Sequence, residues 1–345
     1  MRSLVLALPF LALCITGAQA QQCGPLKRAL SLDLSPGPAG GPLMGVGVTV
    51  NGTPRNFLLN TGGQISRVTR AVVTQQGLSP RSQGKMLNFD GTMSNGYVVT
   101  VDLGVGSAML KSNEMLVDES LGRFDGQFAP DLMQHYDIDF DFAGRKLSYF
   151  LSDHCDGQVV YWPNSGITAV TFRGWIEHNR YPEITIPVSL DGHEVLATIN
   201  TGLANTEVEA DTVLQNFKLT IDSPGAVPMG ARDNNPSHRS FGYTFKTLAI
   251  GGLKISDPRL IVSPDLVGTK GTDTIRADSH VVRYTDNYLP AVRLGMDVLR
   301  RLHFYIAAKE GKVYVTLAAD QAQGAPARTP AAATTPRENA TSGGL

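Results

Sequence analysis

The sequence lacks an excess of charge of either sign. Its 345 residues include 30 Lys and Arg against 31 Asp and Glu, which gives a formal net charge of −1. Proteins that mainly bind nucleic acid contact the phosphates through clustered Lys and Arg. No basic stripe of that kind occurs in the sequence, so we expect no nucleic-acid partner.

Long hydrophobic runs are also scarce. Residues 1–20 contain one, an apolar segment that follows the positive charge of Arg2 and precedes an Ala-Gln-Ala site ending at Ala20. This pattern predicts a secretory signal peptide, and therefore a periplasmic or secreted protein. A lipid anchor on Cys14 is the alternative. No other segment approaches the roughly 18 apolar residues of a transmembrane helix, so we expect no membrane span.

Cysteine is rare, with three residues in the whole chain. Removal of the signal peptide leaves Cys23 and Cys155. In an oxidising compartment an isolated pair favours one disulfide bond, which would tie the mature N-terminus to the middle of the chain. Two free thiols are the alternative.

Several catalytic and metal-binding motifs are missing. The sequence has no GxSxG elbow, no Walker loop and no HExxH, and its seven His residues show no paired ligand spacing. We interpret His135, His193 and His303 as surface or partly packed side chains rather than metal ligands. We therefore expect no metal and no cofactor.

The sequence does contain a long internal repeat. The stretches "NFLLNTGG" and "LATINTGL" each end an apolar run in Asn-Thr-Gly and stand 140 positions apart (200 − 60). Each follows a hairpin signal, Asn51-Gly52 or Asp191-Gly192, at the same offset. Further pairs in this register are Val48 with Val188, Val50 with Leu190, Leu59 with Ile199, and Ser66 with Thr206. A single long repeat of this kind predicts a duplicated domain.

Each repeat closes with a similar unit. "FAPDLMQHYDIDFDFAGRKLSYF" and "RLGMDVLRRLHFYIAAKEGKVYVTL" both predict a short helix-like segment and then a hairpin with its turn at Gly144 or Gly311. In the first unit Asp137, Asp139 and Asp141 alternate with apolar residues. Strict alternation puts them on one face of a strand, and we interpret that face as solvated rather than as a metal site.

These patterns predict an all-β protein with six segments. They are the signal peptide at 1–20, a lead-in at 21–40 without a core element, a first repeat at 41–152, a connector at 153–180, a second repeat at 181–318 and a tail at 319–345. The tail is rich in Ala, Pro, Thr and Gly. It has too little apolar surface to fold, so we expect it to be disordered.

The Asn-Thr-Gly turns are the candidate functional site. A polar residue at the end of a buried strand, followed by Thr and a Gly that allows a sharp turn, holds one side chain at a deep position. Two such turns from duplicated halves can meet on a pseudo-twofold axis. If both polar residues were Asp, the pair would share one proton, and one carboxylate could activate a water molecule.

With these motifs the chain resembles the bacterial exported retropepsin-like aspartic proteases that carry two tandem copies of the domain. The matching stretches are the two Asn-Thr-Gly units, the hairpin "LNFDGTMSNGYVVTVDLGVG", and the closing "APDLMQHYDIDFDF" and "LGMDVLRRLHFYI". The resemblance implies two β-barrel lobes related by pseudo-twofold symmetry, with a cleft between them, and a monomer that needs no second copy. It implies active-site turns at Thr61, Gly62, Thr201 and Gly202, and flap residues at Gly91, Asn95, Gly96 and Tyr97.

The chain departs from the family at the residues that carry the chemistry. The positions of the two catalytic Asp residues are occupied by Asn60 and Asn200. An amide does not titrate in the working range and is a poor base. The first closing unit also reads Ala129-Pro130-Asp131, where the second keeps the Gly-x-Asp of the family.

Three hypotheses follow. The first is a pseudoprotease that binds an extended peptide or a protein partner in the cleft without cleaving it. The second is an active aspartic endopeptidase, which requires that residues 60 and 200 are Asp in a parent protein or become Asp by deamidation. The third is a structural or interaction protein with an unused cleft, in which Asn60 and Asn200 hydrogen-bond each other and the nearby backbone.

Overall fold

The computed structural model describes residues 23–37, 40–63, 65–87, 93–119, 121–162, 166–174, 183–231, 239–264, 275–277, 280–282 and 290–318. Of these residues 54 % lie in strands and 9 % in helices, so the fold is mostly β, as predicted. No helix within these ranges is long and apolar enough to cross a membrane. The predicted signal peptide and the predicted tail at 319–345 lie outside the described residues.

Six strands of the first half close into a barrel. Their order around the barrel is β2 (Met44–Val50), β3 (Thr53–Leu59), β8 (Gly126–Phe128), β4 (Arg67–Thr69), β7 (Ala108–Asp118) and β6 (Met93–Val105). The long strand β6 pairs with β7 and, near its end, with β2, and this second pairing closes the ring. β5 (Arg81–Leu87) lies beyond β6, and α1 (Arg70–Gln75) follows β4.

The described strands of the second half follow the same path. In order they are β12 (Thr185–Leu190), β13 (His193–Ile199), β22 (Val292–Leu294), β14 (Glu207–Glu209), β19 (Arg259–Ser263), β16 (Arg239–Thr244) and β15 (Val227–Ala231). The counterpart of β6 is interrupted here, because β16 ends before β17 (Thr247–Ile250) begins, and β17 makes the pairing with β12. β18 (Leu253–Ser256) pairs with β17, α2 (Ala210–Phe217) follows β14, and β20 (Ile275–Ala277) pairs with β21 (His280–Val282).

Both predicted hairpins are confirmed. Asn51 and Gly52 connect β2 to β3 with φ of 48° and 80°, and Asp191 and Gly192 connect β12 to β13 with φ of 46° and 86°. Positive φ at both central residues is the geometry of a two-residue turn whose twist matches that of the strands. The two hairpins fix the same register in both halves.

The predicted closing units are also present. η2 (Pro130–Leu132) precedes the hairpin of β9 (Asp137–Asp141) and β10 (Lys146–Phe150), and α3 (Met296–Leu299) precedes that of β23 (Leu302–Ala307) and β24 (Lys312–Leu317). Here the halves match at an offset of 166 (297 − 131). The second half therefore holds 26 more residues between its turn and its closing unit (166 − 140).

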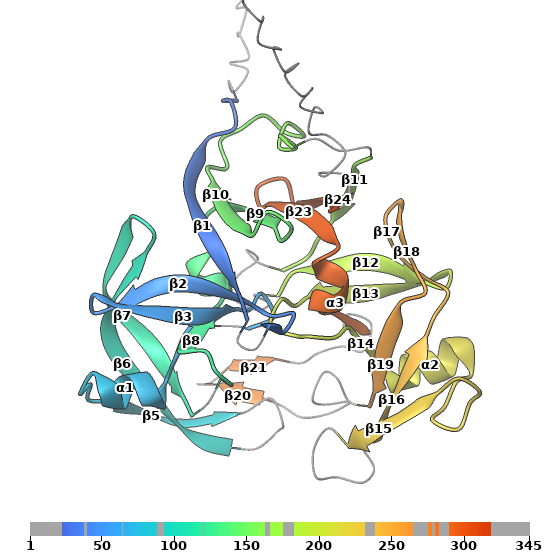
Figure 1. The fold of residues 1–345 in the computed structure, drawn as a ribbon, viewed down its shortest axis with the longest axis horizontal. Coiled ribbons are helices and arrows are strands. Elements are labelled where there is room, and N and C mark those ends of the chain that lie inside the picture. The colour runs from blue at the N-terminus through green and yellow to red at the C-terminus, as the bar shows by residue number, and fades with distance from the viewer. Residues whose placement is uncertain are drawn as a thin grey trace, which may run out of the picture.

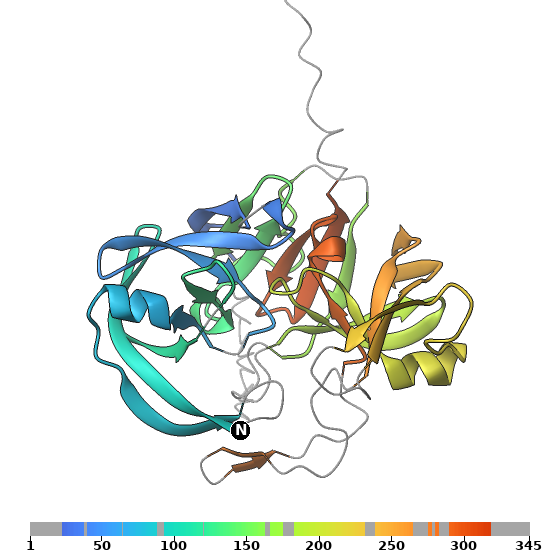
Figure 2. The ribbon, with the colours of Figure 1, turned by 60° about the horizontal axis from the view of Figure 1, so that its bottom comes forward.

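One sheet joins the two halves. Its strands are β11 (Thr168–Thr171), β24, β23, β9, β10 and β1 (Arg28–Pro36), with β23 antiparallel to β9. Asp139 lies opposite Tyr305, and these two positions correspond at the offset of 166 (305 − 139), so equivalent strands of the two closing units pair with each other. On the other face of the sheet the rings of Phe140 and Phe304 stack with centroids 4.6 Å apart. Figures 1 and 2 show β9 and β23 between the barrel in blue and cyan and the second-half sheet in yellow and orange.

The segment predicted as a lead-in contributes to the core. Residues 28–36 form β1, which pairs with β10 and then with β2, and so connects the joining sheet to the barrel. Leu32 and Leu34 of this strand are buried in the main hydrophobic core. The prediction that 21–40 holds no core element is therefore wrong for β1.

The predicted solvated face of β9 is wrong for two of its three Asp residues. Asp137 is 0 % and Asp139 is 1 % exposed, while Asp141 is half-buried. Alternation does place all three on one face, but the chain that follows β10 packs over this face. Its residues Val159 and Trp162 form a second apolar cluster with side chains of the joining sheet.

Each buried Asp has a His partner. Nε2 of His154 lies 2.5 Å from Oδ2 of Asp137, and Nε2 of His303 lies 2.6 Å from Oδ1 of Asp139. His303 also stacks on Trp162 at 3.8 Å between ring centroids. His303 is therefore buried, and its interpretation as a surface or partly packed residue is wrong, whereas His135 and His193 are exposed as expected.

His154 is held between two acceptors. Its Nδ1 lies 3.1 Å from the carbonyl oxygen of Cys155, on the side opposite Asp137. Burial lowers the pKa of His154, but the hydrogen bonds to Asp137 and Cys155 and the charges of Asp137 and Glu310 more than offset it, so the pKa is raised. The imidazolium form is the one that donates to both acceptors.

The predicted disulfide between Cys23 and Cys155 is present, with a sequence separation of 132. The backbone supports it, because the N–H of Gly24 donates to the carbonyl of Asp153 at 2.9 Å. The bond anchors the covering segment beside His154.

We expect stability to fall with rising pH because of His154. Because the pKa of His154 is higher in the folded state, its ion pair contributes fully to the free energy of unfolding below the pKa of the unfolded state, about 6.5. This contribution is lost as the pH rises through the pKa of the folded state. Urea unfolding on both sides of that range should show this loss in the unaltered protein, and a flatter dependence in His154→Gln. The control is His135→Gln, an exposed His that should leave the pH dependence unchanged; equal slopes in all three proteins would contradict the prediction.

Removing the disulfide should destabilise the protein. Cys23→Ser with Cys155→Ser frees a long loop in the unfolded chain, at a cost of about 2 to 5 kcal/mol in the free energy of unfolding. Urea unfolding of the double variant, compared with the oxidised unaltered protein, measures the loss, and the reduced unaltered protein should match the variant. A double variant as stable as the oxidised protein would contradict it.

Candidate functional site

The two Asn-Thr-Gly turns occupy equivalent places in the two halves. β3 ends at Leu59 and β13 at Ile199, immediately before Asn60 and Asn200. The N–H of Asn60 donates to the carbonyl of Phe128 at 2.9 Å, and that of Asn200 to the carbonyl of Leu294 at 3.0 Å. The parallel pairings of β3 with β8 and of β13 with β22 therefore fix the backbone at both Asn residues.

Four crossed hydrogen bonds connect the turns to each other. The hydroxyl of Thr61 donates to the carbonyl of Ile199 at 2.6 Å, and that of Thr201 donates to the carbonyl of Leu59 at 2.9 Å. Each hydroxyl also accepts the N–H of the other Thr, at 3.0 and 3.1 Å. Both Thr residues are 0 % exposed. The structure therefore brings the two predicted turns together at a fully buried contact.

Glycine is required next to each Thr. A Cβ on Gly62 would lie 2.1 Å from the amide nitrogen of Asn200, and a Cβ on Gly202 would lie 2.4 Å from Oδ1 of Asn60. Each Asn side chain thus occupies the space beside the Gly of the opposite turn. A larger residue at position 62 or 202 would therefore clash with the Asn of the opposite turn, which explains why both predicted turns contain Gly there.

Each amide accepts a hydrogen bond from its own turn. The N–H of Gly62 donates to Oδ1 of Asn60 at 3.1 Å, and the N–H of Gly202 donates to Oδ1 of Asn200 at 3.0 Å. Nδ2 of Asn60 donates to Oε1 of Gln127 at 2.9 Å. Among the described residues no hydrogen bond joins the two amides, in contrast to the third hypothesis, in which they hydrogen-bond each other.

In each half an Asp of the closing unit forms hydrogen bonds with the residue six positions after the Asn of the turn. Asp131 accepts hydrogen bonds from the N–H and the hydroxyl of Ser66, at 3.0 and 2.7 Å. Asp297 accepts the same two from Thr206, at 2.9 and 2.7 Å. The correspondence of Ser66 with Thr206 is therefore structural as well as sequential.

The change from Gly to Ala in the first closing unit does not disturb these contacts. The N–H of Ala129 donates to Oγ of Ser66 at 3.0 Å, as the N–H of Gly295 donates to the hydroxyl of Thr206. Burial raises the pKa of Asp131, although the hydrogen bonds from Ser66 oppose the rise. This carboxyl group is occupied in holding the turn.

Gln127 was missed by sequence reasoning. It lies in β8 opposite Leu58, and its Nε2 donates to the carbonyl of Ile65 at 3.1 Å while its Oε1 accepts from Asn60. Arg293 holds the same register position in β22, opposite Thr198. Alignment of "QFAPD" with "RLGMD" would have shown a polar residue two places before each closing turn.

Acidic residues surround Arg293. Its guanidinium forms a salt bridge with Glu207, and both side chains are largely buried. Burial raises the pKa of Glu183, and the charge of Arg293 opposes the rise. In the first half the position of Glu207 is held by Arg67, which pairs with Asp118 at 3.0 Å.

The flap candidates lie partly outside the described residues. Gly91 is not described, whereas Asn95, Gly96 and Tyr97 lie in β6 where it pairs with β5. The guanidinium of Arg70 lies 5.2 Å from the centroid of the Tyr97 ring. Within the described residues, none of these three hydrogen-bonds to an Asn of the turns.

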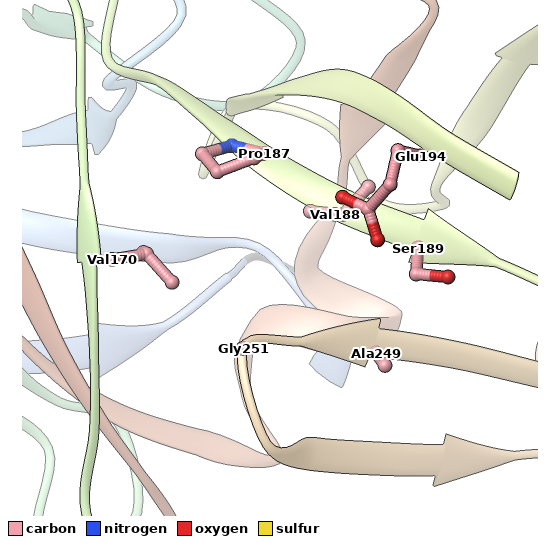
Figure 3. A pocket seen from close by; sticks show the side chains of 7 residues that line it. All are labelled: Val170, Pro187, Val188, Ser189, Glu194, Ala249 and Gly251. Atoms are coloured by element: carbon pink, nitrogen blue, oxygen red, sulfur yellow. The ribbon is translucent and has the colours of Figure 1, made fainter. Parts of the chain in front are cut away.

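A small pocket of about 110 Å³ lies elsewhere (Figure 3). It is lined by residues of β11, β12 and β17, among them Val170, Pro187 and Ala249, and by Glu194 of β13. No residue of either Asn-Thr-Gly turn lines it. It is separate from the candidate site.

No protein-family model matches the chain, and no curated protein matches it.

Loss of one Thr hydroxyl should destabilise the protein. Thr61→Val leaves the carbonyl of Ile199 and the N–H of Thr201 buried without partners, at a cost of about 1 to 3 kcal/mol for each group. Thr61→Ser keeps both bonds and should cost clearly less. Thermal or urea unfolding measures both, and equal losses in the two variants would show that the hydrogen bonds contribute little.

Proposed function

We propose that the chain is an exported aspartic-protease-like protein that binds an extended peptide or protein segment between its two Asn-Thr-Gly turns without cleaving it. The observation that carries this proposal is the pair Asn60 and Asn200, held face to face by the crossed hydrogen bonds of Thr61 and Thr201. Both Asn residues are half-buried rather than sealed, so a ligand can reach them.

The absence of a general base at the turns supports binding over hydrolysis. Activation of water needs a group that takes up a proton near neutral or acidic pH, and an Asn amide does not. Among the described residues, the two carboxylates that support the turns have other partners. Asp131 bonds to Ser66 and Asp297 to Thr206.

Strand addition is the binding mode that fits an extended partner. β5 and β15 are the last strands of their sheets in the described topology, and they occupy equivalent places in the two halves. An extended segment can pair with such an edge through its backbone. Val227 and Met229 of β15 are exposed and two positions apart, so they present one apolar face at that edge.

We expect no peptide hydrolysis by the unaltered protein from about pH 3 to pH 8 and measurable affinity for members of a mixed library of end-blocked peptides. Mass spectrometry of the library measures cleavage, and retention on the immobilised protein followed by calorimetry measures binding. Turnover that disappears in Asn60→Ala would contradict the proposal. An intact mass that shows conversion of both amides to carboxylates would favour the active endopeptidase instead.

The double variant Asn60→Asp with Asn200→Asp tests whether the geometry of the two turns can support peptide hydrolysis once both positions carry a carboxylate. Two carboxylates in this position would share a proton and supply both the base and the acid. We expect gained hydrolysis that a transition-state inhibitor of pepsin type blocks. Asn216→Asp, on the exposed side of α2, is the matched control for added charge and should gain nothing.

A further inference from the structure

Backbone N–H groups determine which side-chain atom of Asn60 and of Asn200 is the oxygen and which is the nitrogen. The N–H of Gly62 can donate only to an oxygen, so the atom of Asn60 that it contacts at 3.1 Å is Oδ1. The same holds for Gly202 and Asn200 at 3.0 Å. Both oxygen atoms are therefore used within their own turns, and both NH₂ groups are directed away from the N–H that holds the oxygen.

The two NH₂ groups differ in their partners. Nδ2 of Asn60 has an acceptor in Gln127, whose own amide is fixed because its Nε2 donates to the carbonyl of Ile65. Arg293 occupies the register position of Gln127 in the other half. A guanidinium has donors only, so it cannot accept from Asn200 as Gln127 accepts from Asn60.

The NH₂ group of Asn200 consequently has no hydrogen-bond acceptor among the described residues. In the described part of the chain its amide bonds only to the N–H of Gly202. Its nitrogen lies against Gly62 of the opposite turn, 2.1 Å from where a Cβ would stand. The centre of the site thus offers hydrogen-bond donors, where two Asp residues would offer a shared proton and a negative charge.

We propose that this pair of amides binds a main-chain carbonyl oxygen of an intact peptide, with Asn200 as the principal donor and Gln127 as the residue that positions Asn60. This inference rests on the proposed function and adds the chemistry of recognition. A neutral carbonyl accepts from the donors and adds no negative charge near the acidic residues Glu207 and Glu183. Glu207 forms a salt bridge with Arg293, and the charge of Arg293 also acts on Glu183. The bound peptide bond stays intact because neither Asn60 nor Asn200 can act as the base that activates water.

The probes are peptides from the library above that bind the unaltered protein, each remade as a series in which one C=O at a time is replaced by CH₂. The replacement removes an acceptor and leaves a protonated amine. For the unaltered protein we expect one position in the series at which affinity falls about tenfold or more.

Asn200→Asp should reverse that preference. At about neutral pH its carboxylate attracts the amine, so at the same position the CH₂ analogue should bind about tenfold more tightly than the parent peptide. Asn216→Asp adds the same charge on α2 and should keep the preference of the unaltered protein. Gln127→Leu should weaken the parent peptide, and Gln127→Glu, which still accepts from Asn60, should weaken it less.

The outcomes separate the two proposals. If no library peptide binds the unaltered protein, the proposed function fails and this inference fails with it. If peptides bind but every CH₂ analogue binds equally well, or Asn200→Asp keeps the preference of the unaltered protein, the donor pair is overturned while peptide binding stands. Circular dichroism and unfolding of each variant establish that a change in affinity is not a loss of fold.

Discussion

The crossed hydrogen bonds of Thr61 and Thr201 are the contact on which the site depends. Each hydroxyl serves as donor and acceptor at once, so four backbone groups of two strand ends are satisfied by two side chains. Since all of these atoms are buried, a shift of either turn would leave polar groups without partners. The arrangement therefore holds the two Asn residues in one relative position and requires Gly62 and Gly202 beside them.

The joining sheet brings equivalent strands of the two halves together further from the site. β9 pairs with β23 with Asp139 opposite Tyr305, and the rings of Phe140 and Phe304 stack on the apolar face of the sheet. The polar faces of these strands bury carboxylates, which is tolerated because each has a His partner. His154 also lies next to the disulfide at Cys155, so the segment that covers the sheet is held by a covalent bond and by an ion pair.

Neutral amides change what the symmetric turns can do. Two carboxylates in contact cannot both ionise, and their shared proton is the source of acid and base chemistry. Asn60 and Asn200 carry no charge to desolvate, and their oxygen atoms are held by Gly62 and Gly202. We propose that the NH₂ groups that remain suit the site to recognition of an uncharged acceptor rather than to catalysis.

Local sequence patterns determined the duplication, the hairpins at Asn51 and Asp191, and the pairing of the two Asn-Thr-Gly turns, because turn geometry and strand alternation depend on residues close together in the chain. They could not show that Asp139 is buried, because the residues that cover it come from a later segment and from β23. Nor could they show that the amide of Asn60 is held by Gln127, 67 residues away. Tertiary structure alone decided those points, since alternation tells which side chains share a face but not what packs against it.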